Sequence, residues 1–462
     1  MEMREIDVRK VLADVPELVN LEAWGQSGWI EGAKVSVTTD CRWSATHDGR
    51  LDFSLLEELR AESLALRTRR GALVLHQPQA TRNTSGLGVS GVAVSMTLSV
   101  AEKEGVEPTV FRVYVKTREL AKRVCFPSGI VDSRRGFRAR ARLSLRISGI
   151  SLDVVALDEG KCLVLETRDV AMGGDEFIAL VFRVRQVLSY LIGEWLSGDS
   201  CALQLGADGE LIRADWFKGQ DRIGNIFHPI PSDWLGWGQA RLKLGFADDR
   251  EPLEEEVLSR VVERFLVEPP LETPISYLLW FSGAPMEMRG ALLSVALESL
   301  TDVLMRKGLC EYPKLLPVDA WEKFSRAMEA LITEYDDGWS KEQRDVIVAR
   351  LRGLNSPTNA AKLTLPFRAL GIELSREERW AIESRNKLLH QGRILRPEYF
   401  RENREAWRQV HEVEMRIYTA VNQLLLTYLE FDGALIDWGS SPIESSDFEY
   451  RQVTQRARRN HT

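Results

Sequence analysis

The spacing of apolar residues changes once along the chain, near residue 250, and this change limits the folds open to it. Before that point, short runs of β-branched and alternating residues are separated by turn formers, which is typical of strands. After the acidic stretch 248–256, apolar residues recur every three or four positions, which is typical of helices. We therefore expect an α+β chain with a β-rich, sandwich-like domain over 1–250, an all-α bundle over 255–435 and a flexible basic tail over 436–462.

Several runs in the first half have the composition of strands. They cover residues 34–39, 71–76, 91–100, 109–116, 137–147, 152–157 and 161–166. Asp158-Glu159-Gly160 and Ala207-Asp208-Gly209 are predicted hairpin turns. The segment 175–196 is long enough to form one helix in this half.

The second half contains several segments with helical periodicity. They cover residues 288–309, 321–335, 343–354, 375–390 and 403–430. In 288–309 the predicted buried face consists of Leu293, Ala296, Leu297, Leu300 and Leu304. In 403–430 it consists of Val410, Val413, Ile417, Val421, Leu424 and Tyr428. The helix over 375–390 is expected to begin with a capping box formed by Ser375 and Glu378.

Bulk composition excludes several classes of protein. The net charge of −7 means that contact with nucleic acid must come from local basic patches. The five cysteines form no CxxC pair, so we expect reduced thiols and neither a disulfide framework nor a metal or cofactor site. Because residues 1–10 lack the core of a signal peptide and no apolar run has the length of a membrane span, we expect a cytoplasmic protein without membrane contact.

The segment 383–393 carries the most informative chemistry, because it holds Arg385, Asn386 and His390. On a helix, these three positions span an arc of about 140°. Gly392 is a predicted C-cap, which places His390 in the last turn, where the helix dipole favours protonated imidazole. We therefore expect the pKa of His390 to lie near or above neutrality.

An arginine and a histidine on one arc suit the cleavage of RNA. RNA carries its own nucleophile, the 2′-OH beside each phosphate. Cleavage then needs proton transfer near pH 7, which His390 can supply, and stabilisation of an anionic phosphorane, which Arg385 can supply through paired N–H donors. This chemistry requires no metal ion.

The sequence here resembles the HEPN superfamily, whose motif is an arginine followed by a polar residue and then by a histidine, with four to six residues between the arginine and the histidine. The segment RNKLLHQG (385–392) is especially similar to the ApeA-like HEPN proteins of bacterial antiphage defence. Those proteins also carry an upstream helix that ALESL (296–300) matches, with Glu298 at the acidic position. The resemblance implies a role for Glu298 in orienting Arg385 or His390. Over 255–435 the resemblance rests on this motif. Over 1–250 it rests only on the β-rich character of the sequence.

The resemblance implies a metal-independent endoribonuclease, a toxin-like hydrolase used in abortive infection, with tRNA among its candidate substrates. The β-rich half would then sense a phage-derived trigger. The sequence also favours a homodimer through the helical domain. One chain has a single suitable histidine, and a two-fold contact would bring Arg385 and His390 of both chains to one cleft.

A second basic feature lies between Arg112 and Arg146, where eleven Lys or Arg residues accompany two acidic ones. Arg138, Arg140 and Arg142 share the parity of one strand face. We interpret this face either as a solvated surface or as a binding site for RNA or another anion.

Other interpretations remain open at this level. Arg385 and His390 also fit an ordinary helix C-terminus, Glu298 a solvated glutamate and His411 a surface histidine. The main alternative function is a catalytically inert HEPN scaffold whose β-rich half binds a ligand or partner. A third, resting only on the 13 tryptophans, is a carbohydrate-binding sandwich joined to a helical dimerisation domain.

Overall fold

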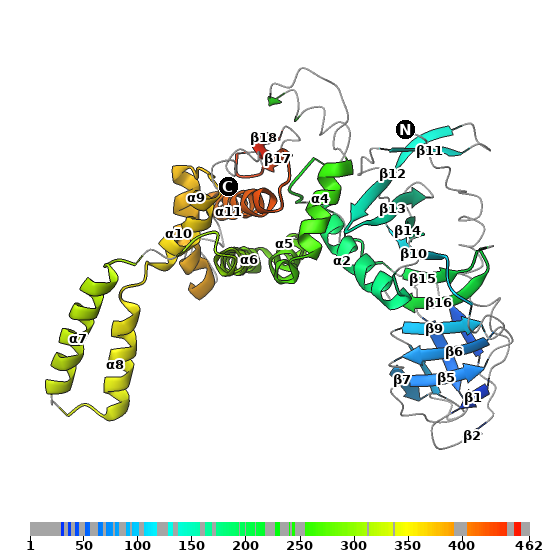
Figure 1. Ribbon diagram of the computed structural model, residues 1–462, viewed down its shortest axis with the longest axis horizontal. Coiled ribbons are helices and arrows are strands. Elements are labelled where there is room, and N and C mark those ends of the chain that lie inside the picture. The colour runs from blue at the N-terminus through cyan, green and yellow to red at the C-terminus, as the bar shows by residue number, and fades with distance from the viewer. Residues whose placement is uncertain are drawn as a thin grey trace. The chain divides into compact units, whose positions relative to one another are not determined.

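The structure is a computed structural model that describes most of the chain after residue 105 and only strands before it. Before that residue it describes strands β1 to β9, whose bounds are given below. After it the described residues are 106–117, 128–132, 137–157, 162–168, 172–193, 195–198, 200–207, 209–217, 227–231, 240, 243–244, 255–311, 314–335, 338–391, 404–440 and 448–453. The N-terminal half contains an antiparallel sheet and the C-terminal half contains helices, so the mixed α+β composition is confirmed (Figure 1).

The chain forms two compact units. The first comprises residues 1–269, 429–436 and 450–452, and the second comprises residues 270–428, 437–449 and 453–462. The first unit therefore includes two short segments that follow the helices in sequence.

The main sheet of the first unit has twelve strands, and every strand pairing that the structure describes in it is antiparallel. From one edge to the other the strands are β11 (Ser128–Asp132), β12 (Phe137–Ile147), β13 (Ile150–Leu157), β14 (Cys162–Thr167), β10 (Val110–Lys116), β15 (Ser200–Leu205), β16 (Leu211–Phe217), β9 (Ser95–Val100), β6 (Gly71–His76), β5 (Ser63–Arg67), β1 (Trp29–Glu31) and β2 (Ser36–Val37).

A second sheet consists of β3 (Arg42–Ala45), β4 (Leu51–Leu55), β8 (Val89–Val92) and β7 (Gln79–Arg82), in that order. The run 91–100 was expected to form a single strand. It is divided instead between β8 and β9, which belong to different sheets. The predicted strands 71–76 and 137–147 match β6 and β12 at both ends.

Tight turns fix the register where the sheet is described best. Between β12 and β13, Ser148 and Gly149 have φ values of 50° and 87°, and Ile147 pairs with Ile150. Positive φ at both central residues is the backbone of a two-residue type I′ hairpin, which favours glycine at the second position. The β13–β14 and β15–β16 hairpins form as expected, although residues 158–161 of the first turn lie outside the described residues.

Helix α2 (Gly174–Ile192) confirms the one helix expected in this half and packs on β10 (Figure 1). The ring of Phe177 lies 5.6 Å from that of Phe111 on β10, and Phe182 meets Phe217 of β16 edge to face at 5.4 Å. Val113 and Val115 alternate with polar residues on β10 and are buried, so this face of the sheet forms the core beneath α2.

Helix α4 (Glu255–Leu266) covers the edge of β12 beyond the point where β11 stops pairing, at Arg142. Along that edge, the backbone N–H groups of three alternate residues donate to α4 side chains. Ser144 donates to Glu255 Oε1 at 3.1 Å, Arg146 to Ser259 Oγ at 3.0 Å and Ser148 to Glu263 Oε1 at 2.9 Å. Two strand residues advance about 6.7 Å and four helix residues about 6.0 Å. The spacing of the donors on β12 therefore nearly matches the spacing of the acceptors on α4 over three hydrogen bonds.

These contacts put α4 in the first unit, whereas its helical periodicity led us to expect it in the helical domain. Strand β18 (Glu449–Val453) lies in the region 436–462 expected to be a flexible tail, and it pairs with β17 (Gly433–Asp437), which ends just inside that region. Most residues of both strands also belong to the first unit. Both differences arise from contacts between residues far apart in sequence, which local patterns do not encode.

The second unit consists of helices. They are α5 (Glu272–Gly283), which follows the 3₁₀ turn η5 (Pro269–Leu271), α6 (Met286–Arg306), α7 (Val318–Glu334), α8 (Lys341–Gly353), α9 (Asn359–Ala369), α10 (Arg376–Gln391) and α11 (Arg404–Tyr428). Every residue of the buried faces predicted for α6 and α11 is buried, which confirms both predictions. Helix α6 contacts α5, α9, α10 and α11 and so forms the centre of this unit. None of the helices that the structure describes has the length and apolar character needed to cross a membrane.

Candidate functional site

Helix α10 positions the residues on which the HEPN resemblance rests. It begins with the predicted capping box, in which Glu378 N–H donates to Ser375 Oγ at 3.1 Å and Ser375 N–H donates to Glu378 Oε2 at 2.8 Å. Glu378, Ala381, Ile382 and Arg385 lie on its buried face. The capping box and the apolar pair together fix the direction and rotation of the helix, and so place Arg385 against α6.

Arg385 forms an ion pair with Glu298 of α6, in which Nη1 of the guanidinium donates to Oε1 of the carboxylate. The arginine side chain is 3% exposed and the glutamate side chain 45% exposed. The structure therefore brings together two residues that the sequence singled out in separate motifs. It also shows that the guanidinium is covered by protein in this conformation and that its charge is balanced by Glu298.

Asn386 and His390 lie in α10, but their side chains are outside the described residues. The backbone places His390 one residue before the last residue of the helix, Gln391, so His390 is in the last turn as expected. Gly392, the predicted C-cap, is outside the described residues. Within the helix, Asn386 is rotated by about 100° and His390 by about 140° from Arg385.

A second histidine of the helical unit, His411 on α11, is half-buried and not the surface residue that the sequence suggested. Burial, and after it the positive charge of Arg289 on α6, lowers the pKa of His411. The neutral imidazole is therefore the form that the fold favours. The apolar periodicity of α11 placed His411 at the flank of the buried face, which could have indicated partial burial.

The lowered pKa of His411 predicts a pH dependence of stability. In the unfolded chain this histidine has a pKa near its ordinary value of about 6.5, so it binds a proton there before it does in the folded chain. The free energy of unfolding should be fully retained above about pH 6.5 and should fall as the pH drops through the lower folded pKa. We expect the fall to be shallower in His411→Gln than in the wild type, as measured by urea unfolding between pH 5 and pH 8. Identical slopes would contradict the assignment.

Of the three arginines predicted to form an anion-binding face, the structure describes one side chain. Arg142 donates to Asp153 Oδ1 of β13 through Nη2 at 2.9 Å and Nε at 3.2 Å, and Ser144 Oγ donates to the same oxygen at 2.6 Å. Arg142 is thus engaged within the sheet. Arg138 and Arg140 lie on β12 opposite Val131 and Gly129 of β11, and their side chains are outside the described residues.

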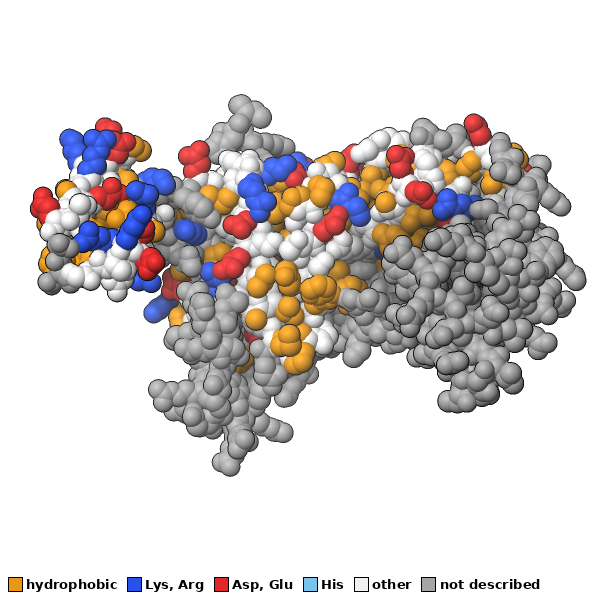
Figure 2. Space-filling model, turned by 90° about the horizontal axis from the view of Figure 1, so that it is seen from below, with side chains coloured by type: hydrophobic (Ala, Val, Ile, Leu, Met, Phe, Trp, Pro, Cys, Tyr) orange, Lys and Arg blue, Asp and Glu red, His pale blue; other side chains and the backbone are white. Residues whose placement is uncertain are grey.

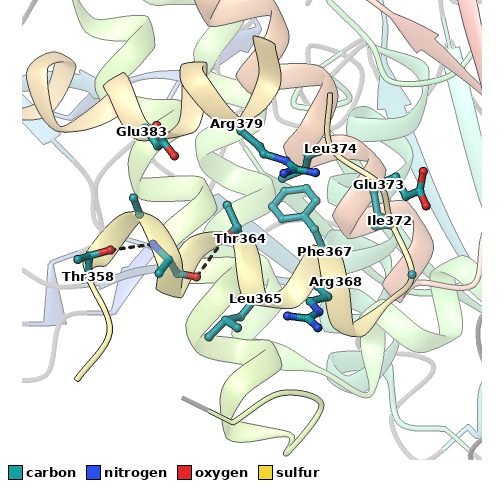
Figure 3. Close-up of a pocket in the computed structure, with 13 residues that line it drawn as sticks. Thr358, Thr364, Leu365, Phe367, Arg368, Ile372, Glu373, Leu374, Arg379 and Glu383 are labelled. Carbon is teal, nitrogen blue, oxygen red and sulfur yellow. Dashed lines mark hydrogen bonds between the residues drawn. The ribbon is translucent and has the colours of Figure 1, made fainter. Parts of the chain in front are cut away.

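A pocket of about 810 Å³ lies between α9 and α10 (Figure 3). Arg368, Arg379, Glu373 and Glu383 line it, together with the ring of Phe367. Glu383 and Arg385 are two residues apart, so they point about 160° away from each other on the helix. With two arginines and two glutamates in its lining, the pocket has no net preference for phosphate, and we do not assign it to the site.

Comparison with known proteins adds nothing to these observations. No family model matches the chain, and neither a curated protein nor a solved structure is detectably similar to it. Among the described residues, no group of three or more His, Cys, Asp or Glu side chains is arranged to hold a metal ion. The candidate site is therefore defined by the chemistry of α6 and α10 alone.

Proposed function

We propose that the chain is a HEPN-type endoribonuclease that cleaves RNA without a metal ion and acts in cell defence. The finer parts of the fold assignment, a sandwich-like sensor and a HEPN bundle, belong to this proposal. So do the expectations of a tRNA substrate, a phage-derived trigger on the β-rich half and a homodimer through the helical unit.

The observation that carries the proposal is the contact between Arg385 and Glu298. The two residues were selected from different motifs, 87 positions apart in the sequence. A chance resemblance of two short motifs would give no reason for their side chains to meet. Their contact is what an acidic residue that orients the arginine requires.

In the proposed mechanism His390 transfers protons to and from the reacting oxygens, and Arg385 stabilises the anionic phosphorane. Arginine has five N–H donors, of which one is engaged by Glu298. To bind a phosphate, the guanidinium must turn its remaining donors outward or leave the carboxylate. Glu298 would then act as a positioning residue, because it touches Arg385 and not the substrate.

A second candidate function is favoured by the burial of the same arginine. A guanidinium that is 3% exposed and paired with a carboxylate also suits a purely structural role. In that case the helical unit would be an inert scaffold, and the β-rich half would bind a ligand or a partner.

RNA incubated with the purified protein in the presence of EDTA distinguishes the two functions. The ribonuclease should cleave RNA despite the chelator and leave 2′,3′-cyclic phosphate and 5′-OH ends, because the attacking oxygen is internal to the substrate. Cleavage that requires added Mg²⁺ would contradict the mechanism. RNA that stays intact whether or not metal and candidate triggers are added would favour the scaffold.

A further inference from the structure

Helices α7 and α8 form a hairpin over residues 318–353 that has almost no core of its own (Figure 1). Its base is joined by Asn355, whose side chain accepts from Leu316 N–H at 2.7 Å and donates to Leu316 O at 3.2 Å. Along the helices, which the structure describes completely, Ile332 is the one buried residue of α7 and Leu351 that of α8. The two helices therefore leave most of their apolar surface uncovered.

The uncovered surface on α7 is a continuous stripe. Its members recur every three or four residues and are Ala320, Phe324, Ala327 and Leu331, continued by Tyr335 directly after the helix, with Met328 at the border. The large residues of the stripe are highly exposed: Phe324 is 43% exposed, Leu331 58% and Tyr335 53%. On this hairpin, at the left of Figure 2, orange side chains lie between charged ones. An apolar stripe of this length on one helix is typical of an interaction surface.

The order of residues along the stripe fits a second copy of itself. If two α7 helices pack antiparallel about a two-fold axis midway between Ala327 and Met328, Phe324 of each faces Leu331 of the other. In the same register Ala320 faces Tyr335 and Ala327 faces Met328. Each small residue then meets a large one, which is the condition for close packing across a helix interface.

The charged residues beside the stripe favour the same arrangement. Lys323 and Glu334 both lie on the flank of the stripe that is turned away from α8, within about 20° of one another around the helix. In an antiparallel pair, residues on one flank meet residues of the same flank, so Lys323 of each chain lies beside Glu334 of the other. A parallel pair would place Lys323 at the level of Lys323 and would lack this attraction.

We infer that the α7 stripe binds the α7 stripe of a second copy of this chain, so that the two hairpins form an antiparallel four-helix bundle. The inference rests on the homodimer in the proposed function and gives that homodimer its surface. It does not require RNA cleavage. Two hairpins that each bury one residue per helix would gain a shared core, which is the packing that stabilises helical bundles.

Charge-reversal variants at Lys323 and Glu334 test the inference by sedimentation velocity at micromolar concentration. The wild type should be a dimer. K323E and E334K should each raise the dissociation constant by about tenfold or more, because each places like charges opposite one another twice in the dimer. An equimolar mixture of K323E and E334K should regain the wild-type dissociation constant, because both cross-pairs are then attractive. The double variant K323E/E334K should regain it as well.

Substitutions in the stripe provide a second measurement. Leu331→Glu should leave a monomer, since it places a charge in the apolar contact, whereas Thr333→Glu, on the opposite side of α7, should remain a dimer. Circular dichroism and thermal unfolding of both variants establish that the helices are intact. A monomeric wild type, or a mixture of K323E and E334K that stays monomeric, would overturn the inference, as would dimers unaffected by Leu331→Glu. Sedimentation uses no RNA, so a failure of the proposed ribonuclease activity is seen separately in the cleavage assay.

Discussion

Replacing His390 by alanine is expected to lower the rate of RNA cleavage by about 10²- to 10⁴-fold, the usual contribution of a side chain that transfers protons. His390 is the histidine of the helical unit that shares a helix with Arg385, and its backbone lies in the last turn of that helix. The measurement is cleavage of total RNA at matched protein concentration, with the chemical ends of the products identified.

His411→Gln provides the matched control for this variant. It removes a histidine from the same unit but from a different helix, and burial lowers the pKa of its half-buried imidazole. Full cleavage by His390→Ala would contradict the assignment of His390. If His411→Gln alone were inactive, the proton-transferring group would have to be reassigned to α11.

The second large effect is expected at the Arg385–Glu298 pair, where the two partners should not be equivalent. Glu298→Ala leaves a buried guanidinium without its carboxylate and should lower the free energy of unfolding by about 1–3 kcal/mol. Arg385→Met fills much of the same volume and leaves a carboxylate that is half in solvent, so its cost should be within about 1 kcal/mol. Urea unfolding of both variants measures the difference.

For the rate of RNA cleavage, the proposed mechanism predicts the opposite order of effects, with the larger loss in Arg385→Met. Arg385→Met removes the group that stabilises the phosphorane and should lower the rate by about 10²- to 10³-fold, while Glu298→Ala should act through the position of Arg385 and have a smaller effect. Arg379→Met is the matched control, because Arg379 is an exposed arginine on the same helix, rotated by about 120° from Arg385. A folded Arg385→Met protein that cleaves RNA at the wild-type rate would assign the arginine to a structural role.

Local signals explain which elements could be predicted from the sequence. The capping box at Ser375, the buried faces of α6 and α11, and the full length of β12 depend on residues close together in the chain. The division of 91–100 between two sheets is different, because it depends on which strand edges lie nearby after folding. Strand order depends on the same distant contacts and was not predicted.

The candidate site shows the same limit. The resemblance implied that Glu298 orients a catalytic residue but left its partner open between Arg385 and His390. Helical periodicity could not decide between them. The periodicity of apolar residues shows on which face of its own helix a residue lies. It does not show which other helix packs against that face. The contact with Arg385 follows from the packing of α10 on α6, which only the three-dimensional structure supplies.

The side-chain ladder between α4 and β12 determines where the protein can be divided. A truncated chain that begins at residue 255 would carry α4 away from its sheet, with Val257, Val261 and Phe265 no longer covered by their neighbours. The complementary piece, 1–254, would keep β12 with three N–H groups released for pairing with other molecules, which is how open sheet edges aggregate. Separation after Pro269 keeps the helix with the strand that it shields, but it still removes 429–436 and 450–452, which belong to the first unit. An insoluble 1–254 fragment would therefore be the expected result of removing α4 and the segments 429–436 and 450–452 from this unit, and it would not show that the complete unit fails to fold.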